Sequence, residues 1–235
     1  MPTLICDVDQ ALLRADLWRV LSLCFARPTT QSMADLHQLS RDLAGVLGTT
    51  NHPLHAGLVD LSDCVAELDP IALEHEHNAL FSMDVLVPAY EGSYQRIERG
   101  TVIGDVAGYY RAFELAPVEQ SGPPDSLWNE LAFVAWLSLK EAYAEDQGMT
   151  EALAITREAM AEFLQDHLGR WTGAFANRLL ETTANPMYCT GAHLLMATVS
   201  MVADELQIEQ ISPLEARALS DESEEVSCFS GCPKP

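Results

Sequence analysis

The feature that most constrains the fold is a long apolar segment that begins directly after two prolines, Pro123 and Pro124. The prolines end any helix before them, and Asp125 or Ser126 can cap the free N–H groups of the next helix. Apolar residues then recur at helical spacing over much of the helix circumference. They are Leu127, Trp128, Leu131, Ala132, Phe133, Val134, Ala135, Trp136 and Leu139. Such a helix is either buried in a core or lines a groove for an apolar guest.

Nearly every other apolar pattern in the chain also has a helical period. Pro28 and Gly48 end two of these segments, and Pro70 occupies the favoured first position of another. The expected helices cover residues 9–26, 32–47, 53–68, 69–81, 105–115, 127–147, 151–168, 171–183 and 186–206, with a short last one from 212. No segment shows convincing β-alternation. We therefore expect an all-α fold, a single multi-helix bundle-like domain over residues 1–219.

Two central segments interrupt this periodicity. Residues 82–105 are expected to form a long irregular connection, and long connections inside a compact domain are often functional. Residues 116–124 contain glycine and proline with few apolar residues and are the candidate hinge. Residues 220–235 are expected to form a disordered acidic tail, which contains a Cys-x-x-x-Cys motif.

The composition combines a globular core with an unusual charge. Hydrophobic residues make up 48% of the 235, which is typical of a folded protein. There are 13 basic and 35 acidic side chains, so the net charge is −22. A surface this negative repels nucleic acid and anionic lipid and attracts cationic ligands or peptides. The alternative is that the charge serves solubility alone or adaptation to a salty habitat.

The chain has no predicted targeting or membrane segment. Its first residues lack a basic region followed by an apolar core, and the most apolar run, 194–203, is too short to cross a bilayer. We therefore expect a cytoplasmic protein without membrane insertion. Cys24, Cys64 and Cys189 lie in helical patterns and are expected to be small core residues in a reducing compartment.

Two groups of residues suggest metal binding. Glu74 and His77 are three apart on a helix and could share a metal, but no second ligand pair is evident, so a structural role is favoured. Cys228 and Cys232 could hold half of a zinc site or form a disulfide, and the acidic residues before them favour an inert or redox-labile tail. Nucleophile and phosphate-loop signatures are missing.

Aromatic and acidic residues concentrate around the two central connections. They are Phe81, Tyr90, Glu91, Tyr94, Asp105, Tyr109, Tyr110, Asp125, Trp128 and Glu130. Carboxylates bind guanidinium groups through paired hydrogen bonds, and aromatic rings pack on the flat faces of guanidinium groups or against apolar side chains. These residue types therefore suit a peptide that has an arginine pair followed by an apolar stretch. The alternative is that the aromatic residues belong to the hydrophobic core and the acidic residues are exposed to solvent. Arg96, Arg99 and Arg111 form the only central basic cluster and are expected to pair with the surplus carboxylates.

Four motifs occur in order between about residues 10 and 205. They are Glu76-x-x-x-Leu80-Phe81, Pro88-Ala89-Tyr90-Glu91-Gly92-Ser93-Tyr94, Pro124-Asp125-Ser126 followed by Glu130-Leu131-x-Phe133, and Phe163 followed by His167-Leu168-x-x-Trp171. In these motifs the chain resembles the TorD/DmsD/NarJ family of redox-enzyme maturation chaperones. Ser126 stands where many members have histidine, so an imidazole contact is not expected there, although Asp125 remains.

The resemblance implies a cytoplasmic, all-helical chaperone that is not an enzyme. It would bind the twin-arginine leader, or the apo form, of the catalytic subunit of a molybdenum-containing oxidoreductase until cofactor insertion and then release it for export or assembly. The molybdenum cofactor would belong to the client. The client-binding candidates are Leu80, Phe81, Tyr90, Glu91, Tyr109, Asp125, Ser126, Trp128 and Glu130. Charge reversal at Asp125 or Glu130 is expected to weaken leader binding without unfolding the protein.

Other interpretations remain open at this point. Related chaperones exchange helices between protomers, and residues 116–124 are where such a homodimer would form. The protein could instead be an all-helical adaptor that uses its negative charge and apolar groove to bind a different basic partner. A metal or redox enzyme would use Glu74, His77 and the terminal cysteines. The client itself is open, with nitrate, chlorate, selenate, sulfoxide and hydrocarbon-oxidising enzymes among the alternatives.

Overall fold

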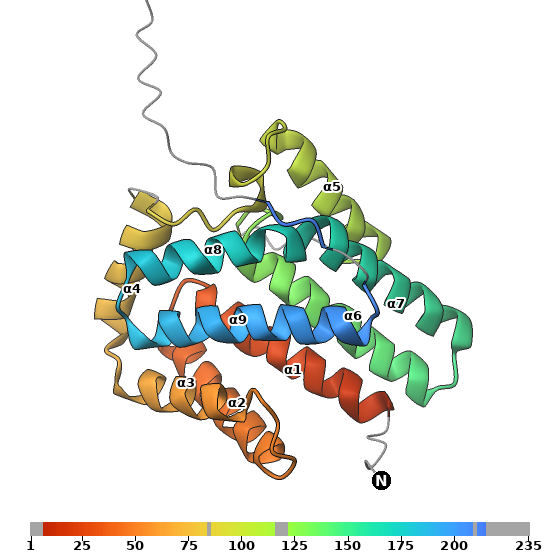
Figure 1. Cartoon of the computed structure of the whole chain (residues 1–235), viewed down its shortest axis with the longest axis horizontal. Coiled ribbons are helices and arrows are strands. Elements are labelled where there is room, and N and C mark those ends of the chain that lie inside the picture. Colours follow the sequence, from red (N-terminus) through yellow and green to blue (C-terminus); the bar gives the residue numbers. More distant parts are fainter. Residues whose placement is uncertain (1–6, 84–85, 116–121, 209–210, 215–235) are drawn as a thin grey trace, which may run out of the picture.

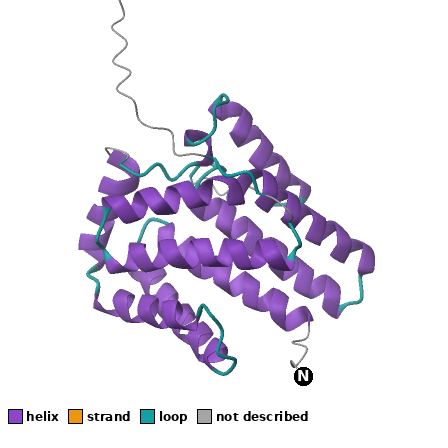
Figure 2. Cartoon of the chain, in the orientation of Figure 1, coloured by secondary structure: helices purple, strands orange, loops and turns teal. Residues whose placement is uncertain are grey.

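The computed structural model describes residues 7–83, 86–115, 122–208 and 211–214, and these contain helices and no strand (Figures 1 and 2). The helices are α1 (Asp7–Phe25), α2 (Thr30–Gly48), α3 (His55–Glu67), α4 (Pro70–Asn78), α5 (Arg99–Ala112), α6 (Leu127–Asp146), α7 (Thr150–Phe163), α8 (Gly169–Thr182) and α9 (Pro186–Glu205). Helix α1 packs along α6, the apolar helix after the two prolines. The predicted all-α fold is confirmed.

The remaining helices surround this central pair. Helix α9 lies across the front of the bundle between α8 and α1, and it also contacts α3 (Figure 1). Helices α2 and α3 pack against each other at one end of the molecule, while α5 projects at the opposite end (Figure 1). No helix in the described ranges is long and apolar enough to cross a bilayer.

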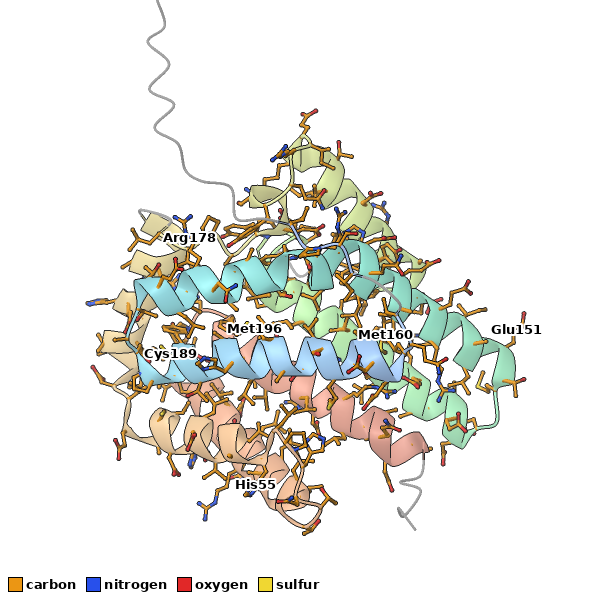
Figure 3. The ribbon with its side chains drawn as sticks, in the orientation of Figure 1. His55, Glu151, Met160, Arg178, Cys189 and Met196 are labelled. Carbon is orange, nitrogen blue, oxygen red and sulfur yellow. The ribbon has the colours of Figure 1, made fainter. Side chains whose placement is uncertain are left out.

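Aromatic side chains fill the core where α1, α8 and α9 meet. The rings of Phe25 and Phe175 are 5.4 Å apart, and those of Phe81 and Tyr188 are 5.6 Å apart, both in edge-to-face arrangements. Met160 of α7 is fully buried beside Ser138 of α6, within the side chains that occupy the space between the ribbons (Figure 3). These contacts account for the apolar periodicity along several helices.

The close approach of α1 and α9 depends on one glycine. A Cβ atom at Gly191 would lie 2.6 Å from the Cys24 sulfur, which is closer than such atoms normally come. Cys24 is buried, and burial raises the pKa of its thiol to about 12. Cys24, Cys64 and Cys189 are all free thiols, so these three form no disulfide, as expected, although Cys64 and Cys189 are only half-buried.

The central connection is shorter than the sequence pattern predicts. Helix α5 begins at Arg99 rather than at 105, because Gly100 and Gly104 interrupt the apolar pattern without stopping the helix. Two expected helices each end in a wider π-helical turn, at Ala79–Met83 and at Leu164–Leu168. Residues 212–214 are not helical. Most of the candidate hinge and the whole acidic tail lie outside the described residues.

We predict that Phe81→Ala destabilises the fold by about 3 to 5 kcal/mol, because it removes a ring that is 1% exposed and packs on His77, Phe175 and Tyr188. Urea unfolding measures this change. The matched control, Ile71→Ala on α4, removes a side chain that is 65% exposed and should change stability by less than about 0.5 kcal/mol. Equal effects of the two substitutions would contradict the packing described above.

Candidate functional site

A short backbone bridge joins the central loop to the start of α6. Tyr90 and Ser126 pair in an antiparallel bridge, in which Glu91 N–H donates to the Asp125 carbonyl at 2.8 Å and Leu127 N–H donates to the Ala89 carbonyl at 3.0 Å. Two motifs that are more than thirty residues apart are thereby brought together. The bridge places Tyr90 and Glu91 of the loop beside Asp125 and Ser126 at the start of α6.

Arg178 of α8 holds the other end of the loop. Its Nε donates to the Leu86 carbonyl at 2.6 Å, and Figure 3 places Arg178 on α8 near the segment that follows α4. Tyr94, at the far end of the motif, donates its hydroxyl to the Pro88 carbonyl at 2.8 Å. The loop is therefore fixed at both ends, although it has almost no regular structure.

A guanidinium group is held between a carboxylate and an aromatic ring. Arg99, the first residue of α5, places Nε 3.1 Å from Oδ2 and Nη2 3.2 Å from Oδ1 of Asp125, which is fully buried. Its Cζ lies 4.6 Å from the centre of the Tyr90 ring. Gly92 N–H also donates to Asp125 Oδ2, at 3.3 Å. The hydrogen bond to Asp125 raises the pKa of Arg99 further, so this group stays charged.

Two further carboxyl groups are buried side by side. Glu91 has both oxygens 3.1 Å from His167 Nδ1, and it accepts a short hydrogen bond from Gln95. Glu130 accepts from Trp171 Nε1 at 3.1 Å. Burial, followed by the negative charge of Glu91, raises the pKa of Glu130 well above its usual range. Glu130 therefore keeps its proton to a higher pH than an ordinary glutamate does, and in that form it can donate to Glu91.

Only part of the predicted aromatic set gathers at one place. Tyr90 is half-buried and meets Trp128 edge to face at 5.8 Å, beside the Arg99 guanidinium. Tyr109 instead packs on Phe163 at 5.3 Å and on His167 at 5.4 Å. Tyr90 and Trp128 thus lie beside Arg99 and Asp125, whereas Tyr109 packs on His167, the partner of Glu91.

Most of the candidate residues are buried. Leu80, Phe81, Glu91, Asp125, Ser126 and Glu130 are at most 4% exposed, whereas Tyr90, Tyr109 and Trp128 are half-buried. Leu80 and Phe81 belong to the hydrophobic core. In this conformation, therefore, the acidic side chains are buried beneath the site, and the partly exposed candidate residues are the aromatic ones.

The expected helix cap is wrong. Ser126 occupies the N-cap position of α6, but its side chain makes no capping hydrogen bond, and the Asp125 carboxylate faces Gly92 and Arg99 instead. This arrangement also changes the choice of variants. Reversing the charge of Asp125 or Glu130 would bury an unmatched charge and destabilise the fold, so the amide substitutions are the informative ones.

The Glu74–His77 pair has structural contacts. Glu74 pairs with Arg27, with Nε 3.0 Å from Oε1, and the buried His77 places Nε2 3.3 Å from the Phe25 carbonyl oxygen. In the part of the chain that the structure describes, no group of three or more His, Cys, Asp or Glu residues could hold a metal ion. Glu74 therefore pairs at the surface and His77 contacts the backbone in the interior. Cys228 and Cys232 lie outside the described residues.

Sequence reasoning did not assign His167 and Trp171 to the site. Their spacing of four residues carried the signal, because such residues lie on one face of a helix. His167 reaches the acid pair from the turn where α7 becomes α8, and Trp171 reaches it from the start of α8. Gly169 makes this turn possible, since a Cβ atom there would lie 2.4 Å from the Leu164 carbonyl oxygen. The sequence predicts that Arg99 pairs with a carboxylate, and the structure identifies that carboxylate as Asp125.

Comparison with known proteins identifies the family. Residues 49–177, more than half of the chain, match the model of the nitrate reductase delta subunit family. The chain belongs to this family. The resemblance to the TorD/DmsD/NarJ chaperones is thereby confirmed, and members of the family are assembly chaperones rather than catalysts.

Individual relatives agree with this assignment. The chain is 33% identical over 115 residues to a selenate reductase assembly chaperone protein of Thauera selenatis, an alignment that covers 47% of this chain. It spans 58% of the length of that relative. A solved structure from Archaeoglobus fulgidus, described as a redox enzyme maturation protein, superposes with a TM-score of 0.53 at 20% identity, covering 79% of this chain and 93% of that one. The second similarity supports the fold alone.

We predict that Glu130→Gln flattens the pH dependence of stability. Because the folded protein keeps the Glu130 proton to a higher pH than the unfolded chain, whose glutamates titrate at about 4.3, this contribution is complete in acid and is lost as pH rises through the folded pKa. The amide keeps an acceptor for Trp171 and a donor for Glu91. Urea unfolding between pH 5 and 9 should show the variant gaining on the wild type as pH rises, whereas the exposed Glu98→Gln should follow the wild type.

Proposed function

We propose that this member of the family binds the cationic leader of the catalytic subunit of a molybdenum-containing oxidoreductase. It holds that subunit until cofactor insertion and then releases it for export or assembly. The observation that carries this proposal is the site between the Asp125 carboxylate and the Tyr90 ring, which in this structure binds the guanidinium group of the protein's own Arg99. A twin-arginine leader presents guanidinium groups beside an apolar stretch, and both elements suit this site.

Two properties of the molecule support the choice of a cationic ligand. The net charge of −22 accelerates encounter with a basic segment through long-range attraction. Tyr90 and Trp128 are only half-buried, so their rings can contact the apolar residues that follow the arginines. The relative in Thauera selenatis is described as an assembly chaperone of a reductase, and we extend that role to this chain.

The proposal also places the event in time and space. A leader is accessible to a chaperone only before its subunit is exported, so we propose that binding occurs in the cytoplasm. The molybdenum cofactor belongs to the client in this scheme, and the chaperone contributes no catalytic group. Exchange of helices between two copies at residues 116–124, which the family resemblance implies, is a separate proposal, and most of that segment lies outside the described residues.

The decisive experiment is purification of the tagged full-length chain from its native host, followed by identification of the bound proteins. We expect a large molybdenum-enzyme subunit that still carries its leader. Recovery of an unrelated basic protein in its place would support an adaptor role and contradict the proposal.

We predict that Asp125→Asn weakens binding of a synthetic peptide copy of that leader by about ten- to hundredfold, because it removes a charge-assisted hydrogen bond to guanidinium. Fluorescence anisotropy measures the affinity, and urea unfolding checks that the variant is folded. Trp128→Ala should also weaken binding through lost apolar contact. Asp60→Asn on the exposed face of α3 changes the net charge equally and should bind as the wild type does. Equal affinities for all four proteins would contradict the assignment of the site.

A further inference from the structure

The geometry points to a self-occupied arginine site, in which Arg99 holds the place that an arginine of the client takes on binding. This inference rests on the proposed function and deepens it, because it adds a competitor that lies within the chain. Arg99 already makes the contacts that a bound arginine needs, two hydrogen bonds to Asp125 and one aromatic face from Tyr90. A client arginine therefore has to exchange with Arg99 rather than add to it.

The site is shaped for a guanidinium group and its stem. A Cβ atom at Gly92 would lie 2.6 Å from Arg99 Cγ and 3.1 Å from Asp125 Oδ2, so only glycine leaves this space open. The floor of the site is then the Gly92 backbone, one wall is the Tyr90 ring and the far end is the Asp125 carboxylate. Planar guanidinium fits this combination better than the compact ammonium group of lysine does.

Arg99 is held less firmly than the carboxylate that it contacts. Its side chain is 45% exposed, whereas that of Asp125 has no exposure. It is also the first residue of α5, at the positive end of the helix dipole, where a cation is disfavoured. Residues 96–98 before it are exposed. These features allow Arg99 to leave the site toward solvent.

Helix α5 keeps other anchors when Arg99 leaves. Tyr110 is buried and donates its hydroxyl to the Pro124 carbonyl at 2.9 Å, and Val102 and Val106 are buried in the core. The Asp125 carboxylate, in contrast, cannot remain in the interior without a cationic partner, because an unpaired buried charge is strongly disfavoured. Displacement of Arg99 is therefore favourable only when another cation arrives, and the shape of the site favours the guanidinium group of an arginine.

Competition from Arg99 lowers the apparent affinity for a client arginine. The factor is the ratio of molecules with Arg99 in the site to molecules with the site open. Removing Arg99 should therefore strengthen binding, although it also removes a salt bridge. If the Arg99–Asp125 pair served only to tie α5 to α6, its loss would destabilise the fold and would leave peptide affinity unchanged or weaker. The two interpretations thus predict opposite directions for one measurement.

The test is titration of the full chain and of Arg99→Ala with a short synthetic peptide that contains an arginine pair followed by apolar residues. We expect Arg99→Ala to bind it about tenfold tighter than the wild type. The same peptide with lysines in place of both arginines should gain much less. Arg27→Ala is the matched control, because it loses an exposed ion pair with Glu74 and lowers the net charge equally, and it should bind as the wild type does.

Three outcomes would overturn the inference. They are an unchanged or weaker affinity of Arg99→Ala, an equal gain for the lysine peptide, and an equal gain in Arg27→Ala. If Arg99→Ala does not fold in the urea assay, Arg99→Gln replaces it, since that variant keeps part of the stem against Tyr90 but not the charge. A client subunit recovered from the native host together with no gain in Arg99→Ala would refute the exchange and leave the proposed function standing. Absence of arginine-peptide binding by both proteins would refute the exchange and weaken the proposed function.

Discussion

The site depends on the burial of three carboxyl groups, Glu91, Asp125 and Glu130, which come from two separate segments of the chain. Each is removed from water, and each needs a partner to offset the loss of hydration. Arg99 from α5 supplies a charge, Trp171 at the start of α8 supplies an N–H group, and His167 from the preceding π-helical turn pairs with Glu91. The acids therefore determine how four parts of the chain come together around the start of α6.

The same acids explain why an irregular loop can be well placed without a sheet or a long helix. The Tyr90–Ser126 bridge provides only two backbone hydrogen bonds, and Arg178 and Tyr94 fix the ends of the loop. Side-chain contacts to Glu91 and Asp125 supply the remaining restraint. A loop held in this way can release one contact, such as that of Arg99, while the others maintain its position.

Exposed and buried acidic residues have two different roles, long-range attraction and short-range selection, which the composition alone cannot distinguish. Most of the excess negative charge attracts cationic segments from a distance, where salt and solvent weaken it. The buried carboxylates act at short range and select a group by its geometry, since Asp125 presents two oxygens to one planar guanidinium. Attraction and selection thus come from different residues, and each should respond differently to added salt.

The sequence alone determined the helices, because apolar residues at helical spacing and prolines at their starts act locally, as at Pro70 and Pro186. It also carried the family motifs and the pairing of aromatic and acidic residues near Asp125. It could not decide which acids are buried, which arginine pairs with Asp125, or that Tyr109 packs on His167 while Tyr90 packs on Trp128, because these depend on contacts between distant segments. It also missed the early start of α5, since Gly100 and Gly104 obscure the periodicity. Only the tertiary structure decided these points, because the desolvation of a carboxylate and the identity of its partner are fixed when the helices pack.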